Sequence, residues 1–545
     1  MGGRLARLSA VAAALVTGAA LPGCATQHGS REARQSSSGF PVAATFRAHG
    51  GRPLREPREL RSHDGVLRAT LRVADAVVDV AGARVRAKAY DGRFPGPTLR
   101  VRPGDTLELR VVNRMGEPTN LHEHGFHVSP IDISDNVLRT MPGHSANRVR
   151  VRIPHDIAPG TYWYHAHLHG LVEEQVFSGL SGVIIVEGLV GRLPRALRAV
   201  PDHLIALKDL QVRGGAIVDH AIDSGAPTTR TVNGQLDPVL RVRTNRTQLL
   251  RLANVSADIW YRLALDDARF NVIAEDANPV GRVWTARELV LPPGKRYDVL
   301  VRWPNPGTYR LLTLPMNTGP EGDEYPGRRL ATLHVSGPPA RDVPWPRSLG
   351  SLPGLQHSHV DRVRHVTFSE DAAKDRYLIN GRQFDATRVD QVVRLGATEE
   401  WVIRNTTREQ HPFHLHVDDF QVIAVNDRPY HARSLQDTVP LPAGGTVRIR
   451  MRFRHYLGVF VYHCHILAHE DAGMMAVVEV TRTGRRPSAR TLRLLRAMRH
   501  AMSSADHDHH AVGPHARHAV RGGGVGSFER GRYWWCPLLG SRISR

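Results

Sequence analysis

The sequence predicts an all-β protein built from three Greek-key β-sandwich domains. Runs in which apolar and polar residues alternate recur along the chain, and turns rich in Pro and Gly separate them. Such period-two runs are typical of antiparallel strands with one buried and one solvated face. A related block of sequence also occurs three times at a spacing of roughly 140 to 150 residues, which is the size of a whole sandwich domain.

The repeated block is a strand pattern that ends at an asparagine each time. Related segments begin at Leu99, Leu240 and Val392 and run into alternating strands that end near Asn113, Asn254 and Asn405. Later in each repeat another alternating run precedes a turn and an aromatic strand, as in residues 159–162. Turn signals at such short intervals indicate Greek-key sandwiches and little helix.

The chain length of 545 residues is sufficient for three domains of ordinary size. We expect these domains at residues 65–190, 200–340 and 357–484. Charged residues at 23% and apolar residues at 41% are typical of a soluble globular protein rather than a disordered or multi-span membrane protein.

The formal net charge of +21 comes almost entirely from arginine, because Lys88, Lys208, Lys295 and Lys374 are the only lysines. The arginines are spread along the predicted strands without interleaved aromatic residues or a recognition helix, so compositional bias explains them better than nucleic-acid binding. We therefore predict no nucleic-acid partner.

Both ends of the chain differ from the predicted domains. Residues 1–24 resemble a bacterial export signal, and Leu21-Pro22-Gly23-Cys24 is similar to a lipobox. We expect export to the periplasmic or extracellular face of the cell membrane, with a lipid anchor at Cys24 as the only membrane contact. Pro22 is unusual in a lipobox, so ordinary cleavage remains the alternative. Residues 25–64 have the composition of a disordered tether, and residues 485–545 that of a basic, His-rich disordered tail that binds copper or simply stays solvated.

The most informative stretch is residues 462–474. On a strand, His463 and His465 share one face while Cys464 points to the other. His469 and Met474 follow in the next turn. Thiolate, imidazole and thioether are the donors of a blue-copper site, which needs one further imidazole.

Histidines at matching spacing occur elsewhere in the first and third repeats. They are His122, His124, His165, His167, His411, His414 and His416. The middle repeat has no histidine at the corresponding places, residues 256–261 and 311–312, and is therefore a spacer or a wall. The first and third domains must share an interface if their histidines are to meet.

These motifs resemble, in order, the four copper motifs of the multicopper oxidase family, across residues 69–480. The resemblance implies cupredoxin-like domains and four copper ions. It assigns a type 1 copper to His411, Cys464, His469 and Met474, and a type 2 copper to His122 and His414. The type 3 pair falls to His124, His165, His167, His416, His463 and His465. By the same resemblance, Asp135 and Glu470 match proton-relay carboxylates, whereas Asp437 is interpreted as structural.

The resemblance implies an oxidase that takes one electron at a time from phenols, aromatic amines or similar donors and reduces dioxygen to water. A cuprous oxidase in copper tolerance is the alternative, and it predicts methionines near the type 1 site. Only scattered methionines occur, Met115, Met141 and Met316 among them. A non-enzymatic copper-binding protein on the same fold is the third hypothesis. The oligomeric state is not readable from the sequence.

Overall fold

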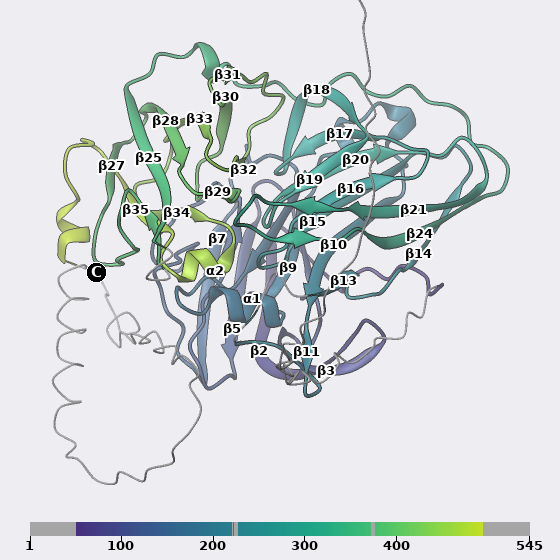
Figure 1. The fold of residues 1–545 in the computed structure, drawn as a ribbon, viewed down its shortest axis with the longest axis horizontal. Helices are drawn as coiled ribbons and strands as arrows, with labels where there is room; N and C mark the ends of the chain where they lie inside the picture. The colour runs from purple at the N-terminus through teal and green to yellow at the C-terminus, as the bar shows by residue number, and fades with distance from the viewer. Residues whose placement is uncertain (1–50, 221, 223–226, 372–375, 494–545) are drawn as a thin grey trace, which may run out of the picture. The chain divides into compact units, whose positions relative to one another are not determined.

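The computed structural model describes residues 51–220, 222, 227–371 and 376–493, and these form an all-β fold (Figure 1). The strands assemble into three pairs of sheets, each with one six-stranded and one five-stranded sheet. The prediction of three cupredoxin-like β-sandwich domains is confirmed. The signal-like residues 1–24, Cys24, and most of the predicted tether and tail lie outside the described residues.

In the first sandwich, the five-stranded sheet has the order β1-β4-β9-β8-β6 and the six-stranded sheet the order β11-β12-β3-β2-β5-β7. The hairpin β11–β12 follows the first strand of the second sandwich but pairs with β3, through Ala216 opposite Arg86. The strands are β1 (Glu59–Arg61), β2 (Val66–Val80), β3 (Ala83–Tyr90), β4 (Thr98–Val101), β5 (Thr106–Asn113), β6 (His122–His124), β7 (Ser145–Arg152), β8 (Gly160–His165), β9 (Ser181–Val186), β11 (Val212–Arg213) and β12 (Ala216–Ile217).

The second sandwich has sheets of order β13-β10-β15-β20-β17-β18 and β14-β24-β21-β16-β19, with a small hairpin, β22–β23, beside them. Its strands are β10 (Asp202–Leu210), β13 (Thr229–Val232), β14 (Val239–Arg243), β15 (Gln248–Asn254), β16 (Tyr261–Leu265), β17 (Phe270–Glu275), β18 (Asn278–Ala286), β19 (Glu288–Leu291), β20 (Arg296–Val301), β21 (Gly307–Leu314), β22 (Met316–Asn317), β23 (Glu324–Tyr325) and β24 (Arg328–Ser336).

The third sandwich has sheets of order β26-β25-β28-β33-β30-β31 and β27-β35-β34-β29-β32. Its strands are β25 (Arg362–Asp371), β26 (Arg376–Ile379), β27 (Gln391–Arg394), β28 (Thr398–Asn405), β29 (His411–Leu415), β30 (Phe420–Val425), β31 (Arg428–Pro429), β32 (Thr438–Leu441), β33 (Thr446–Arg452), β34 (Gly458–Cys464) and β35 (Met475–Thr481). The strands β8, β21 and β34 each pair antiparallel with the last strand in sequence of their five-stranded sheet, which is β9, β24 or β35.

Helix is scarce in the described residues, as the sequence predicts. The α-helices are α1 (Val172–Ser178) and α2 (Leu467–Asp471), the 3₁₀ turns are η1 (Val190–Arg192), η2 (Arg195–Leu197) and η3 (Leu355–His357), and residues 489–493 are also helical. The helices α1 and α2 pack together (Figure 1), and the Asp471 carboxylate accepts hydrogen bonds from the N–H groups of Gly170 and Glu173. No helix among the described residues is long and apolar enough to cross a membrane.

Each sandwich has its own apolar core between its two sheets. Trp260 and Trp303 lie in the second core, Tyr90 and Tyr164 in the first, and Trp401 in the third, all fully buried. Fully burying a large apolar side chain stabilises a fold by about 1.5–3 kcal/mol. The third core also contains Cys464 and Met474, so the predicted metal donors lie against a rigid apolar layer.

Two predicted boundaries need correction, the end of the tether at residue 64 and the start of the tail at residue 485. Residues Glu59–Arg61 do not belong to a disordered tether but form β1, which pairs with β4, and the Arg100 guanidinium donates to the Glu59 carboxylate at 2.7 Å. The predicted tail, from residue 485, is likewise ordered at its start, because the Thr491 hydroxyl donates to Glu479 at 2.6 Å. Composition alone missed these contacts, since they depend on partners far away in the sequence.

Candidate metal centres

Strand β34 places donor groups on both of its faces. It pairs with β29 so that Phe413 lies opposite Cys464 and His414 lies opposite His463. Successive side chains of a strand point to opposite faces, and Cys464 accordingly meets one set of histidines while His463 meets another. Cys464, His463 and His465 are fully buried. Two clusters of donor groups therefore adjoin one strand.

The first cluster, which we call the Cys464 centre, consists of Cys464, His411 and His469. The Cys464 Sγ lies 3.5 Å from His411 Nδ1 and 3.8 Å from His469 Nδ1, and the two Nδ1 atoms lie 3.2 Å apart. The three donor atoms are close enough together for one metal ion to contact them all. One sulfur and two imidazoles are the main donors of a blue-copper site.

Met474 is held beside this centre by its main chain. Its N–H donates to the His469 carbonyl at 2.8 Å, and its carbonyl accepts from the Cys464 N–H at 3.0 Å. The Met474 side chain is buried in the same core cluster as Cys464, whereas Met475 packs in a separate cluster with Val461. Of the two adjacent methionines, Met474 is therefore the one on the Cys464 side of the sheet.

The outer edges of the two imidazoles meet polar groups. The His411 Nε2 atom lies 2.8 Å from the Thr407 hydroxyl and 3.2 Å from the Glu370 carboxylate. The His469 Nε2 atom lies 3.7 Å from Glu409, and the Tyr377 ring stacks on His469 with centroids 4.1 Å apart. His469 is 8% exposed and His411 is fully buried, so His469 is the more accessible imidazole of the Cys464 centre.

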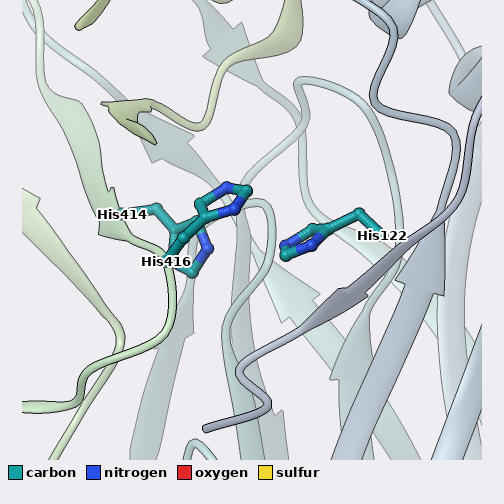
Figure 2. Close-up of side chains that lie close together, drawn as sticks. All are labelled: His122, His414 and His416. Carbon is teal, nitrogen blue, oxygen red and sulfur yellow. The ribbon is translucent and has the colours of Figure 1, made fainter. Parts of the chain in front are cut away.

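The second cluster, which we call the histidine cluster, brings together eight histidines from the first and third sandwiches. They are His122, His124, His165, His167, His414, His416, His463 and His465, and each is at most 2% exposed. Rings from the two sandwiches stack in pairs, His122 on His416 at 4.0 Å and His124 on His414 at 3.8 Å. Figure 2 shows His122 facing His414 and His416 across this interface.

Ring nitrogens within the histidine cluster converge as metal ligands do. The His463 Nε2 atom lies 3.2 Å from His167 Nε2 and 3.1 Å from His416 Nε2. Several groups of three donor atoms in the cluster, such as His122, His414 and His416, all lie within 4.8 Å of one another. The histidines that the sequence assigned to the polynuclear site are therefore in one place.

One ring nitrogen of several clustered histidines is held by the protein, and the other is left without a hydrogen-bond partner. The Nδ1 atoms of His165 and His414 lie 2.8 Å from the carbonyl oxygens of Ala166 and Asp437, and His122 Nδ1 lies 2.8 Å from Asp135. Their Nε2 atoms are buried and have no partner in the described part of the chain. Metal-ligating histidines show this arrangement, in which one nitrogen is oriented by the protein and the other binds the metal.

Burial favours the neutral form of three of the clustered imidazoles. Burial, reinforced by neighbouring histidines, lowers the pKa of His165, His414 and His416 well below the usual range. In the Cys464 centre, burial raises the pKa of the Cys464 thiol well above its usual range. Neutral imidazole is the ligand form, and a buried thiol becomes a thiolate only beside a cation, so both sites suit a bound metal ion.

The two carboxylates predicted as proton-relay groups lie against the histidine cluster. Asp135 contacts His122, whereas Glu470 lies 2.9 Å from His463 Nδ1 and 3.4 Å from His167 Nδ1. Burial raises the pKa of Glu470, but His167 and His463 together outweigh burial, so its pKa lies below the usual value. Both carboxylates therefore lie in direct contact with histidines at the edge of the cluster.

Sequence reasoning missed one contribution to the cluster. Asp437 contacts the cluster through His124 and is itself paired with Arg296 of the second sandwich, at 2.6 Å. Arg296 comes from the domain that carries none of the predicted ligands. No local pattern marks it, because the contact exists only after the three sandwiches have come together.

The fold and the two donor clusters define a metalloprotein of cupredoxin-like architecture. Three sequence models described as multicopper oxidase match residues 73–189, 202–338 and 355–484. The chain is 27% identical over 473 residues to a laccase of Bacillus subtilis, covering 73% of this chain and 90% of the laccase. It is 26% identical over 516 residues to the multicopper oxidase MmcO of Mycobacterium tuberculosis, covering 86% and 96%.

Solved structures agree with these sequence relatives. A multicopper oxidase from Campylobacter jejuni, described as a metallo-oxidase, superposes with a TM-score of 0.70 at 26% identity, covering 79% of this chain and 95% of that one. The chain belongs to the multicopper oxidase family. It is an oxidoreductase that uses copper, a donor substrate and dioxygen.

Proposed function

We propose that the protein is a laccase-like oxidase with four copper ions in two centres. In this proposal, His411, Cys464, His469 and Met474 hold a type 1 copper. His122 and His414 hold a type 2 copper. His124, His165, His167, His416, His463 and His465 hold a type 3 pair. The observation that supports it most is the convergence of donor groups on both faces of β34.

Bound copper would supply one-electron chemistry, so that electrons from four donor equivalents reduce one dioxygen to two waters. The chain connects the two centres directly, because Cys464 is peptide-bonded to both His463 and His465. The cluster itself is closed to bulk water, since its histidines are almost fully buried. Such closure limits the release of partly reduced oxygen.

The proton supply is assigned to Asp135 and Glu470. Making water consumes protons, and a positioned acid next to the reacting group is the usual source. Asp135 holds His122 Nδ1 on one side of the cluster, and Glu470 lies against His463 and His167 on another. We propose that these two carboxylates pass protons to the oxygen that is being reduced.

Phenols and aromatic amines are the proposed donors, with His469 as the contact point because it is the less buried imidazole of the Cys464 centre. Metal-ion oxidation is the second candidate, favoured by one observation. The carboxyl groups of Glu370 and Glu409 lie beside the outer nitrogens of His411 and His469, and carboxyl oxygens are common ligands of metal cations. Soft Cu(I) would prefer methionine ligands near the Cys464 centre. Met115 and Met141 do not provide them, because both lie in the core of the first sandwich.

Oxygen uptake by the copper-loaded protein separates these hypotheses. The laccase-like proposal expects uptake with a phenolic donor such as 2,6-dimethoxyphenol, and similar uptake in the variant Glu409→Gln. A metal-ion oxidase would take up oxygen with Cu(I) but hardly with the phenol, and Glu409→Gln would slow it. A protein that binds copper but takes up no oxygen with either donor would be a copper-binding protein without oxidase activity.

We also propose that the protein is exported, with Cys24 as a lipid anchor. This proposal is supported by the sequence of residues 1–24 alone. Labelling of the expressed protein with a radioactive or alkyne-tagged fatty acid, compared with Cys24→Ala, tests the anchor. Labelling that persists in the variant would rule it out.

A further inference from the structure

The second sandwich places a turn directly against the histidine cluster. The turn joins β19 to β20 and contains Gly294, whose φ is +82°. A Cβ atom at Gly294 would lie 2.9 Å from His465 Cδ2 and 3.1 Å from His124 Cε1. Glycine is therefore required for this approach, and the middle domain forms a wall of the cluster.

Arg296 follows this turn and connects all three sandwiches. Its side chain is fully buried. The guanidinium donates to Asp437 through both Nη atoms, at 2.8 and 2.6 Å. It also donates to the Thr161 carbonyl at 3.1 Å and to the Gly294 carbonyl at 2.9 Å. Thr161 belongs to the first sandwich and Asp437 to the third, so one side chain holds the parts that build the cluster.

Asp437, which Arg296 holds in place, contacts two histidines of the cluster. Its Oδ1 atom lies 3.1 Å from His124 Nε2, and its main-chain carbonyl lies 2.8 Å from His414 Nδ1. His124 and His414 come from different sandwiches, and their rings stack with an angle of 12° between them. The opposite nitrogens, His124 Nδ1 and His414 Nε2, are buried without a partner in the described residues.

The space for this pair is provided by the residue after His124. Gly125 has a φ of +84°, and a Cβ there would lie 2.5 Å from Asp437 Oδ2 and 2.7 Å from Arg296 Nη2. Any side chain at residue 125 would displace the ion pair. The histidine motif of the first sandwich is thus shaped to receive an arginine from the second and an aspartate from the third.

We propose that Arg296 is a positioning residue for the copper cluster. By pairing with both oxygens of Asp437, it holds the carboxylate where the His124 Nε2–H donates to it, and this leaves His124 Nδ1 for copper. The same pair keeps the Asp437 carbonyl in place for the His414 Nδ1–H, which leaves His414 Nε2 for copper. This inference rests on the proposed copper sites and adds a role for the domain without copper ligands.

The geometry makes arginine specific here. A guanidinium presents a planar fork of donors that matches a carboxylate, whereas an ammonium presents a single charged point. Arg296→Lys keeps the positive charge but cannot make the two contacts to Asp437 together with those to Thr161 and Gly294. Mutation of a residue that hydrogen-bonds a metal-ligating histidine typically changes the metal affinity by about 10- to 100-fold.

Arg251 offers a matched control. It is a second buried arginine of the middle domain, with a side chain 3% exposed, and it pairs with Asp202 and Asp298. Its guanidinium also donates to the Thr161 hydroxyl at 3.4 Å. Among the described residues, none of these partners of Arg251 is a histidine of the cluster. Arg251→Lys therefore perturbs a similar buried ion pair of the second sandwich without a direct connection to the cluster.

The experiment measures bound copper per protein, the type 2 signal in electron paramagnetic resonance, and the blue absorption of the Cys464 centre, in protein titrated with copper. We expect Arg296→Lys to keep the blue absorption but to bind copper in the cluster with about 10- to 100-fold lower affinity. The type 2 signal of the variant should differ from that of the wild type. Arg251→Lys should retain the wild-type copper content and signal. Asp437→Asn, which keeps the side-chain shape, should reproduce the Arg296→Lys result and serves if that variant folds poorly.

Two outcomes would overturn the inference. One is a wild-type type 2 signal and copper affinity in both Arg296→Lys and Asp437→Asn. The other is an equal loss of copper in Arg296→Lys and Arg251→Lys, which would indicate a general effect of buried ion pairs. A wild-type protein that binds no copper would instead refute the proposed function, so the two failures are distinguishable.

Discussion

The Cys464 centre and the histidine cluster lie on opposite faces of the same strand, but they are assembled differently. His411, Cys464, His469 and Met474 all belong to the third sandwich, within 64 residues of one another. The histidine cluster draws side chains from the first and third sandwiches, and a turn of the second lies against it. The donor groups of one centre thus come from one domain, whereas those of the other come from two domains with the third against them.

Because of this difference, the two centres should respond to different changes. Substitutions inside the third core should affect the Cys464 centre first, whereas substitutions at the interface between Arg296 and Asp437 should affect the histidine cluster and leave the Cys464 centre intact. The positioning role of Arg296 is one such case. Variants on either side of β34 can therefore test whether the centres are separable.

The largest effect is expected for Cys464→Ser. A serine hydroxyl cannot replace a thiolate as a soft ligand for copper, so the blue absorption and donor-driven oxygen uptake should both be lost completely. Because the cluster histidines face the other way, the variant should still bind copper in the cluster. Visible spectroscopy, copper analysis and oxygen uptake measure the three properties. Blue colour that survives the substitution would contradict the assignment of Cys464.

The two centres also differ in how far the sequence predicted them. Most of the Cys464 centre was predictable from one stretch, because short spacing brings Cys464, His469 and Met474 together, whereas His411 was assigned by the family resemblance. The clustered histidines were predictable as pairs, and the lack of histidines in the second repeat showed that the first and third domains had to meet. The role of Arg296 was not predictable, because the contact between residue 296 and residue 437 has no local signature.

The two ends of the described region show the same limit. Residues near Glu59 have the composition of a linker, but Glu59 becomes part of a sheet because Arg100 is there to pair with it. Thr491 is held in a similar way by Glu479. Composition reports what a segment can do alone, whereas its order in the fold depends on a partner.

The second prediction acts on the cluster side. Asp135→Asn removes a carboxylate that contacts His122, so dioxygen reduction should slow by about 100-fold, the lower part of the range for a lost general acid. The blue absorption should be unchanged. Stopped-flow reoxidation of the reduced, copper-loaded protein measures the rate, and copper analysis excludes loss of metal.

Asp132→Asn is the matched control for that experiment. Asp132 is three residues away, but its side chain is 64% exposed and pairs with Arg490 at the surface. It should reoxidise at the wild-type rate. Equal rates in all three proteins would remove Asp135 from the proton relay.

The third prediction acts on the Cys464 side. Met474→Leu replaces a thioether by a hydrocarbon beside the centre, and loss of a weak axial sulfur ligand should raise the reduction potential of the type 1 copper. Met475→Leu is the control, because Met475 packs in a different cluster from Cys464. Redox titration of the blue absorption should show a higher potential in Met474→Leu only. A potential that rises equally in both variants, or in neither, would count against Met474 as the axial ligand.

The smallest effect is expected at the interface between the first and third sandwiches, and it concerns stability rather than copper. His127 of the first sandwich lies 2.8 Å from the Val417 carbonyl and 2.9 Å from His455 Nδ1, both in the third. Burial lowers the pKa of His127 to about 4. Between about pH 6.5 and pH 4, the imidazole of His127 is therefore neutral in the folded protein. In the unfolded chain it is protonated there, because the pKa of an unperturbed histidine is about 6.5.

Because the unfolded state binds more protons between about pH 6.5 and pH 4, His127 makes the folded protein less stable as the pH falls through that window. The free energy of unfolding should fall by up to about 3 kcal/mol near pH 4 from this group. His127→Gln removes the titration, so the melting temperature of the variant should fall less than that of the wild type between about pH 7 and pH 4.5. His220→Gln, whose side chain is 81% exposed, should follow the wild type. If His127→Gln lost stability with pH as steeply as the wild type, the interface between the cluster-bearing domains would not be the acid-sensitive one.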